Sequence, residues 1–314
     1  MKYLILFLLT TVNALTPVCR EGGKLRSDLQ FKYSYKESIE DSSKDIDFSQ
    51  RSGVFVKCTA AGTTGTAVPC ESVATGEGPG LDRFGWATQT MVGVKGSVKF
   101  YSPGNDLTTA DHDFTSGTEC GSKVILPTGA NWGAAVCKEA VRVYYYDGSV
   151  WSDHASLSFP GVNHDISIDI NHEDYMIVRA SGAVKIYRLG IVVEEVQDLI
   201  GDGLVAATVN CKGSVFAYES AGAIKIKQLS QKDLSWTDLS DIATDAVAME
   251  MSSDVFAVSS ASEVKIYMFA NGGTSYEEYK ILKGGNNFGK LIALKHDDLA
   301  VTDDTRTYFF HDSS

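Results

Sequence analysis

A short strand pattern occurs six times along the chain at nearly even intervals. In its clearest copy, residues 264–269, apolar side chains alternate with basic or aromatic ones, as in a β-strand that is partly buried on both faces. The copies begin at residues 98, 141, 184, 224, 264 and 305, so successive copies lie 43, 43, 40, 40 and 41 residues apart. This spacing is typical of a β-propeller, whose four-stranded blades each need roughly 40 to 45 residues.

The repeats predict one all-β domain. We expect a seven-bladed β-propeller of four-stranded antiparallel sheets, with six blades as the alternative. Residues 29–314 would form this domain, and residues 15–28 would be an N-terminal tail. Residues 1–14 have the basic start, the short apolar run and the small residues of a secretory signal peptide. The run is too short to span a bilayer, so we expect a secreted protein.

The two ends of the repeat array are its least regular parts. The last copy ends at Phe310 without a fourth strand. We expect the alternating residues 29–35 to supply that strand, which would close the ring and remove two exposed sheet edges. Blade one is expected over residues 45–72, with residues 66–72 as its third strand. Blade two is expected to open with a strand at residues 82–87.

A basic residue recurs at the second position of the repeated strand. The basic residues are Lys99, Arg142, Lys185, Lys225 and Lys265. One interpretation is a basic stripe that binds phosphate or anionic sugars. We favour a structural interpretation, in which the long stems pack between blades and the charged heads reach acids on the adjacent strand, such as Glu277 or Glu278.

Net charge and cysteine content indicate the environment of the protein. The formal charge of −12 argues against binding to nucleic acid or an anionic membrane. All six cysteines follow the expected cleavage site and fit up to three disulfides in an oxidising compartment. Hairpin geometry predicts two local pairs and elimination leaves a third; the pairs are Cys58–Cys70, Cys120–Cys137 and Cys19–Cys211. No asparagine lies in an Asn-X-Ser/Thr frame, so we expect no N-linked glycan.

Two segments resemble a known repeat. Phe84-Gly85-Trp86-Ala87 and Phe288-Gly289-Lys290-Leu291-Ile292-Ala293 each precede a valine-rich strand, and both resemble the FG-GAP repeat of the integrin α-subunit propeller. The repeat pattern covers most of the mature chain, although the Phe-Gly pair is intact in only two blades. The resemblance implies seven blades, an extracellular setting and a role in binding proteins or sugars rather than catalysis.

Calcium loops are common in that family, and this chain departs from their Asp-X-Asp-X-Asp-Gly pattern. The nearest segment, residues 169–174, has acids and an amide but lacks the glycine that permits the sharp turn. We interpret it as a polar turn. No metal and no other cofactor is expected.

The sequence contains no recognisable catalytic motif. It has no G-x-S-x-G elbow and no H-E-x-x-H helix, and its six histidines are scattered over different blades. We interpret Asp111-His112-Asp113 as a solvated acidic run, and the four tryptophans as packing between blades, with sugar-stacking platforms as the alternative. We therefore expect no enzymatic activity, although carboxylates that converge on the central channel would be invisible in a sequence.

The binding prediction comes from the loops between blades. The strands repeat closely, whereas the connections from one blade's outer strand to the next blade's inner strand vary, and in a propeller these connections share one face. They offer amides, acids and few apolar groups; the candidate residues are Asp82, Arg83, Asn163, His164, Asp202, Asn286 and Asn287. We predict that this face binds a protein partner or the extracellular matrix, with a carbohydrate-binding lectin as the alternative and a glycan hydrolase third. We expect a monomer.

Overall fold

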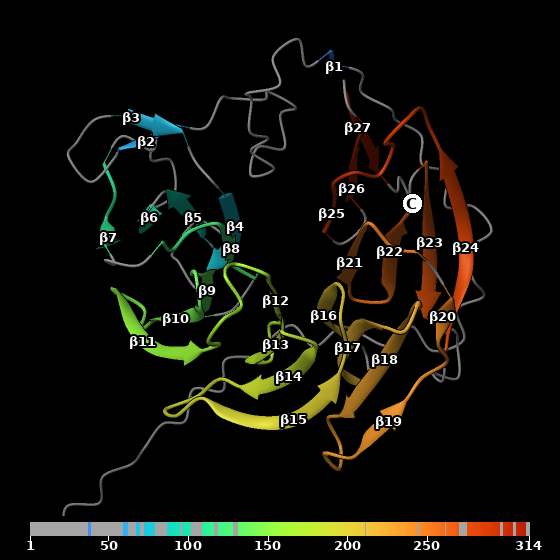
Figure 1. The fold of residues 1–314 in the computed structure, drawn as a ribbon, viewed down its shortest axis with the longest axis horizontal. Coiled ribbons are helices and arrows are strands. Elements are labelled where there is room, and N and C mark those ends of the chain that lie inside the picture. The colour runs from blue at the N-terminus through green and yellow to red at the C-terminus, as the bar shows by residue number, and fades with distance from the viewer. Residues whose placement is uncertain are drawn as a thin grey trace, which may run out of the picture.

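The described residues form blades arranged around one axis. A computed structural model describes residues 37–38, 59–61, 67–69, 72–78, 87–94, 96–101, 109–115, 119–127, 131–210, 212–243, 245–260, 262–269, 275–295, 298–303 and 306–311. In these ranges every regular element is a β-strand, and the strands form six antiparallel sheets and one two-stranded ribbon. Figure 1 shows the sheets following one another around a centre.

Blades 2 to 7 are numbered as in the sequence prediction, and their strands run from the innermost outward. Blade 2 contains β4 (Ser72–Gly78), β5 (Ala87–Val94), β6 (Ser97–Tyr101) and β7 (His112–Thr115). Blade 3 contains β8 (Lys123–Ile125), β9 (Trp132–Val136), β10 (Ala140–Tyr146) and β11 (Trp151–Ser158). Blade 4 contains β12 (Ile166–Ile170), β13 (Tyr175–Ala180), β14 (Ala183–Arg188) and β15 (Glu194–Ile200).

The remaining sheets follow the same plan. Blade 5 contains β16 (Val205–Asn210), β17 (Gly213–Ser220), β18 (Ala223–Ser230) and an outer edge made of β19 (Trp236–Asp238) and β20 (Ile242–Ala243). Blade 6 contains β21 (Ala248–Ser252), β22 (Val255–Ser259), β23 (Glu263–Phe269) and β24 (Tyr276–Lys283). Blade 7 contains β25 (Ile292–Lys295), β26 (Asp298–Thr302), β27 (Arg306–His311) and β1 (Glu37–Ser38).

The antiparallel order divides the connections between two faces. The innermost strands β4, β8, β12, β16, β21 and β25 lie side by side in this order (Figure 1). Because successive strands alternate in direction, the connections between blades and the turns between second and third strands share one face. We call it the interblade face. The turns that join first to second and third to fourth strands lie on the opposite face.

The repeated strand of the sequence is the third strand of each described blade. Its copies coincide with β6, β10, β14, β18, β23 and β27, as predicted. The ribbon of β2 (Thr59–Ala61) and β3 (Ala67–Pro69) lies in the segment predicted as blade one. The structure describes six of the seven predicted blades as sheets. The seventh blade, blade one, therefore stays a prediction.

The inner strand of blade 2 differs from its prediction. Residues 82–87 were expected to open this blade, but β4 (Ser72–Gly78) pairs with β5 along its whole length. The prediction assigned residues 66–72 to the third strand of blade one, whereas Ser72 is the first residue of β4. It was wrong because β4 is rich in small residues and lacks the alternating bulky apolar pattern by which the other strands are recognised in the sequence.

Apolar clusters fill the space between consecutive blades. Five such clusters are found among the described residues, and each combines side chains of two neighbouring blades. Between blades 2 and 3, the ring of Phe100 stacks on that of Trp151 with centroids 4.2 Å apart. Trp132 and Trp151 are both buried. The interpretation of these two tryptophans as packing residues is therefore confirmed.

The recurrent basic side chains form ion pairs with acids at the outer edge of the same blade. Their partners are Asp113 for Lys99, Asp153 for Arg142, Glu195 for Lys185, Asp241 for Lys225 and Glu278 for Lys265. These pairs confirm the structural interpretation of the basic residues. They also give Asp113 of the Asp111-His112-Asp113 run a structural role, since it accepts hydrogen bonds from Lys99 and Ser97.

An N-terminal strand completes blade 7. β1 pairs antiparallel with β27, with Glu37 opposite Thr307 and Ser38 opposite Arg306. The predicted closure of the last blade by an N-terminal strand is confirmed at these two residues. Residues 29–35, which were expected to form it, lie outside the described part of the chain.

We predict that this closure stabilises the ring. Removing residues 15–38 exposes the hydrogen-bonding edge of β27 and should lower the midpoint of thermal unfolding by about 4 °C or more. Differential scanning calorimetry of these deletion variants and of the chain that begins at residue 15 measures this. Removing only residues 15–28 serves as the control and should shift the midpoint by less than about 1 °C. Equal midpoints for both deletions would contradict the closure.

Candidate functional site

The connection between blades 3 and 4 has an unusual backbone. Asn163 and His164 have φ values of 49° and 68°, a left-handed region that residues other than glycine rarely adopt. The backbone N–H of His164 donates to the carbonyl of Lys138 (2.7 Å), and the N–H of Gly161 donates to Oε1 of Glu139 (3.1 Å). These bonds anchor the loop on blade 3 and leave the Asn163 side chain exposed.

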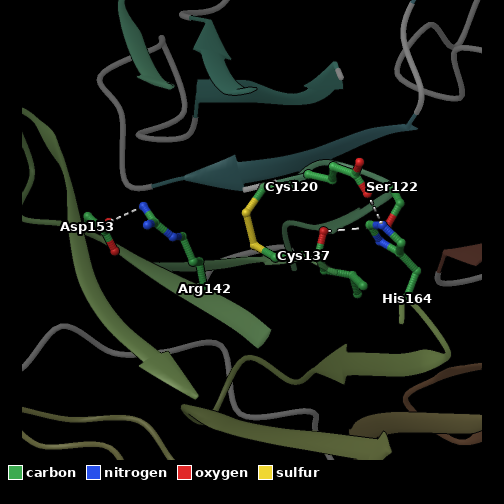
Figure 2. The surroundings of a disulfide bond; sticks show 8 residues. Cys120, Ser122, Cys137, Arg142, Asp153 and His164 are labelled. Atoms are coloured by element: carbon green, nitrogen blue, oxygen red, sulfur yellow. Dashed lines mark hydrogen bonds and ion pairs between the residues drawn. A yellow bond between two sulfur atoms is a disulfide. The ribbon is translucent and has the colours of Figure 1, made fainter. Parts of the chain in front are cut away.

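His164 links this connection to the preceding one. Its Nε2 lies 3.1 Å from Oε2 of Glu119, which belongs to the connection between blades 2 and 3. Figure 2 shows His164 near the disulfide between Cys120 and Cys137. This disulfide fixes the residue after Glu119 to the end of β9. The predicted Cys120–Cys137 pair is confirmed, and the other two pairs involve cysteines outside the described residues.

Arg179 extends the linkage to a third connection. This residue lies near the end of β13, and its Nε donates to the carbonyl of Gly203 (2.8 Å) in the connection between blades 4 and 5. One terminal nitrogen donates to Oδ1 of Asp165 (2.6 Å), the residue after His164. Charge-assisted bonds of this kind are stronger than neutral ones. Three successive interblade connections are therefore tied together through His164 and Arg179.

Asp202 lies in the connection that Arg179 reaches. Its backbone N–H donates to the carbonyl of Glu219 (3.1 Å), while the Glu219 N–H donates to the carbonyl of Leu204 (3.0 Å). A Cβ added at Gly201 or Gly203 would lie within 3 Å of Glu219 atoms, so the chain approaches Glu219 more closely there than another residue permits. The carboxylate of Asp202 is exposed.

The connection before blade 7 carries the second Phe-Gly pair. Phe288 is buried in the apolar cluster between blades 6 and 7. Gly289 has a φ of 93°, and a Cβ there would lie 2.7 Å from the Cβ of Ser259 in blade 6. The Phe-Gly pair therefore packs between blades 6 and 7 and anchors this connection. Asn286 and Asn287 precede it on the surface, and Asn287 has a φ of 57°.

Asp82 and Arg83 lie outside the described residues. Because β4 and β5 are neighbouring strands of one blade, residues 79–86 join two strands within blade 2. Asp82 and Arg83 were assigned to a connection between blades, whereas the strands before and after them, β4 and β5, belong to one blade. Participation of these two residues in binding stays a prediction.

The interblade face is more apolar than the sequence suggested. Ile200, at the end of β15, is 83% exposed, and Val247, before β21, is 49% exposed. Leu291, before β25, is 56% exposed. The expectation that these connections carry few exposed apolar groups was wrong, because a loop sequence does not show which of its aliphatic side chains the adjacent blades bury. Three consecutive connections each present one.

Known proteins share the fold of this chain at low sequence identity. No protein-family model matches the sequence, and no curated protein matches it. The Cps50 (Swd1) β-propeller domain of Myceliophteria thermophila matches with a TM-score of 0.54 at 15% identity, over 78% of this chain and 83% of that one. The chain is a β-propeller.

Two further structures agree with this fold. Hsv2 of Kluyveromyces lactis matches with a TM-score of 0.53 at 12% identity, over 78% of this chain and 75% of that one. A protein from Lactobacillus plantarum matches with a TM-score of 0.53 at 14% identity, over 76% and 79% of the two chains. The TM-scores indicate a shared propeller fold. Sequence identities this low give no information about shared partners.

Two inner-strand carboxylates near the propeller axis escaped the sequence analysis as a pair. Asp169 on β12 accepts the backbone N–H groups of Ala207 (2.7 Å) and Ile170 (2.8 Å), yet burial raises its pKa to about 6. Burial and the charge of Asp169 raise the pKa of Glu250 on β21 to about 8, and Lys123 on β8 opposes this rise. The available signal was a single acid inside each apolar strand, Ile-Ser-Ile-Asp-Ile and Ala-Met-Glu-Met-Ser.

The segment compared with a calcium loop is a strand end followed by a turn. Asp169 belongs to β12, and Oδ1 of Asn171 accepts the backbone N–H groups of Glu173 (3.0 Å) and Tyr175 (3.1 Å). The interpretation as a polar turn is confirmed. Among the described residues no group of three or more His, Cys, Asp or Glu side chains could hold a metal ion, and no helix is long and apolar enough to cross a membrane.

The raised pKa of Glu250 predicts a pH-dependent stability. Between the ordinary pKa of about 4.5 and the folded value of about 8, the folded chain binds more protons than the unfolded chain. The contribution of Glu250 to the free energy of unfolding therefore falls as pH rises through this window. Replacing Glu250 with Gln removes the titrating group. Between pH 5 and pH 9 the unfolding midpoint of the wild type should therefore fall by about 2 to 4 °C more than that of the variant.

Thermal unfolding at several pH values measures this difference. Glu277 is an exposed glutamate on β24, and Glu277→Gln is the matched control, which should follow the wild-type profile. Parallel profiles for Glu250→Gln and the wild type would contradict the account of the inner-strand pair.

The disulfide predicts a second stability effect. It closes a loop with a sequence separation of 17 residues, for which chain entropy predicts a stabilisation of about 3 kcal/mol. The double variant Cys120→Ser/Cys137→Ser should lose that amount in guanidinium unfolding. Peptide mapping without reduction checks the bond and tests the predicted pairs Cys58–Cys70 and Cys19–Cys211. Free thiols at Cys120 and Cys137 in the purified protein would contradict the structure.

Proposed function

We propose that this protein is a secreted, non-catalytic propeller whose interblade face binds a protein partner or the extracellular matrix. The observation that carries the proposal is the composition of that face. Ile200, Val247 and Leu291 each expose an aliphatic side chain in consecutive interblade regions. Exposed polar residues such as Asp202 and Asn286 lie in two of the same regions. Mixed apolar and polar surfaces of this kind suit protein interfaces.

The backbone of this face is well anchored. The hydrogen bonds of Glu119, Arg179 and Glu219 hold the connections in place. Within the described ranges, the side chains of Asn163, Asp202 and Asn286 make no hydrogen bond that would occupy them. A loop that is already ordered loses less conformational entropy when it binds. These side chains are therefore well placed to contact a partner.

The three tryptophans in the described part of the chain favour a protein partner over a glycan. Sugar sites commonly use a flat aromatic face as an apolar partner for C–H groups. Trp132 and Trp151 are buried, and Trp236 packs against Phe216 with ring centroids 5.7 Å apart. The lectin interpretation is thus the alternative, and glycan hydrolysis comes third.

Secretion and the FG-GAP resemblance belong to the same proposal. The disulfide between Cys120 and Cys137 suits an oxidising compartment. The close insertion of Phe288 and Gly289 between blades 6 and 7 gives the Phe-Gly pair a packing role. Both observations support a secreted propeller similar to the integrin α-subunit type.

A capture experiment tests the proposal. Mature protein is used to isolate partners from a secreted proteome and is applied in parallel to a glycan array. Two interblade variants are compared with the wild type, Asn163→Ala/Asp202→Ala/Asn286→Ala and Ile200→Ser/Leu291→Ser. Each should weaken binding to the captured partner at least about 10-fold, because interface energy concentrates in few residues.

The control variant changes three exposed residues on outer strands, Ser156→Ala/Thr237→Ala/Glu277→Ala. It should bind as the wild type does. Partner binding that survives both interblade variants, or that is lost in the control, contradicts the proposed face. A specific signal on the glycan array, together with no protein partner, would replace the proposal with the lectin alternative.

A further inference from the structure

The opposite face exposes aliphatic side chains at equivalent places in three consecutive blades. Val150 is 46% exposed between β10 and β11, Ile191 and Val192 are 98% and 76% exposed between β14 and β15, and Leu234 is 66% exposed between β18 and β19. Figure 1 shows these turns at the outer ends of blades 3, 4 and 5. We call these four residues the rim tips. One exposed aliphatic residue needs no explanation, but folding alone gives no reason for this recurrence.

The turn of blade 4 holds its rim tips rigidly. The backbone N–H of Leu189 donates to the carbonyl of Asp174 (2.7 Å), and the Leu189 side chain is buried. The His154 ring of blade 3 donates from Nε2 to the carbonyl of Gly190 (2.8 Å). On the other side, Val193 packs against the cluster between blades 3 and 4. Ile191 and Val192 therefore stand at the apex of an anchored turn. The outer strand β15 begins directly after this turn, at Glu194.

The turns of blades 3 and 5 are fixed by aspartates. Oδ1 of Asp147 accepts the backbone N–H groups of Ser149 (2.8 Å) and Val150 (2.9 Å). Oδ1 of Asp233 accepts the N–H (3.2 Å) and the hydroxyl (2.7 Å) of Ser235. Leu234 has a φ of 56°, where glycine or asparagine fits with less strain. Neither its conformation nor its exposure favours leucine for folding.

Each rim tip has a carboxylate close to it in the sequence. Asp147 precedes Val150 by three residues, Glu194 follows Val192 by two, and Asp233 directly precedes Leu234. Hydrogen bonds from Ser149 and Val150 lower the pKa of Asp147, and those from Ser230 and Ser235 lower the pKa of Asp233 to about 2. Asp147 and Asp233 therefore stay charged at physiological pH. Arg188 and Lys232 are also exposed in these turns, so the repeated feature is an aliphatic side chain beside an acid rather than a uniformly acidic surface.

We propose that the rim tips of blades 3 to 5 form a second interaction surface, for a protein segment that combines apolar side chains with lysine or arginine. Apolar groups of such a segment would cover the rim tips, and its cations would meet Asp147, Glu194 and Asp233. A second copy of this chain fits less well, because it would bring carboxylates together in a chain of net charge −12. This surface lies on the opposite face from the one proposed above, so the propeller would bridge two partners.

Defined peptides test this surface. The probes are fluorescent short peptides of alternating Lys and Val, Glu and Val, or Lys and Ser, and the measurement is fluorescence anisotropy with the mature protein. The Lys-Val peptide should bind more tightly than the other two. The variant Ile191→Ser/Val192→Ser/Leu234→Gly should weaken its binding at least about 10-fold, and Glu194→Gln about 2- to 3-fold.

Ile200→Ser is the matched control, since Ile200 is an equally exposed aliphatic residue on the interblade face. It should leave peptide binding unchanged, which also separates this test from that of the proposed function. Equal binding by the wild type and the rim-tip variant, equal affinity for the Glu-Val peptide, or no Lys-Val binding up to about 1 mM would overturn the inference. Dimers or zwitterionic vesicle binding that disappear in the rim-tip variant would overturn it as well, by assigning the rim tips to a second copy or to a lipid surface.

Discussion

Burial of apolar side chains between neighbouring blades is the constraint on which the rest of this structure depends. Each blade is a small sheet with two apolar faces, and its own residues cannot cover both. The described clusters accordingly combine side chains of adjacent blades, as where Phe100 meets Trp151. Each fully buried side chain of this size contributes about 1.5 to 3 kcal/mol. A blade is therefore stable only beside its neighbours, and the pairing of β1 with β27 completes the last blade.

The parts of the fold that could be predicted from the sequence are those that recur in every blade. The third strands carry large apolar residues and a basic residue that pairs across the blade, so their spacing was visible without coordinates. The inner strand β4 was missed because Ser72, Ala74 and Gly76 give no such pattern. What identified β4 was its pairing with β5, a long-range property that local sequence does not contain.

The candidate site was predictable in its location and not in its details. Propeller topology correctly assigned Asn163, His164, Asp202, Asn286 and Asn287 to interblade connections. Glu119 contacts His164, 45 positions away, and Arg179 contacts Gly203, 24 positions away. No local sequence motif predicts contacts between residues so far apart. The effect of Asp169 on the pKa of Glu250 likewise depends on two strands from different blades. The exposure of Ile200 and Leu291 could not be predicted either, because it depends on where the neighbouring blades lie.

We propose the interblade face as the surface through which this propeller binds a partner. Hydrogen–deuterium exchange of the protein, with and without a captured partner, tests this proposal. We expect slower exchange in residues 159–165, 201–204, 245–247 and 284–291, and unchanged exchange in the outer strands. Protection confined to the outer strands, with none in these four connections, would contradict the proposal.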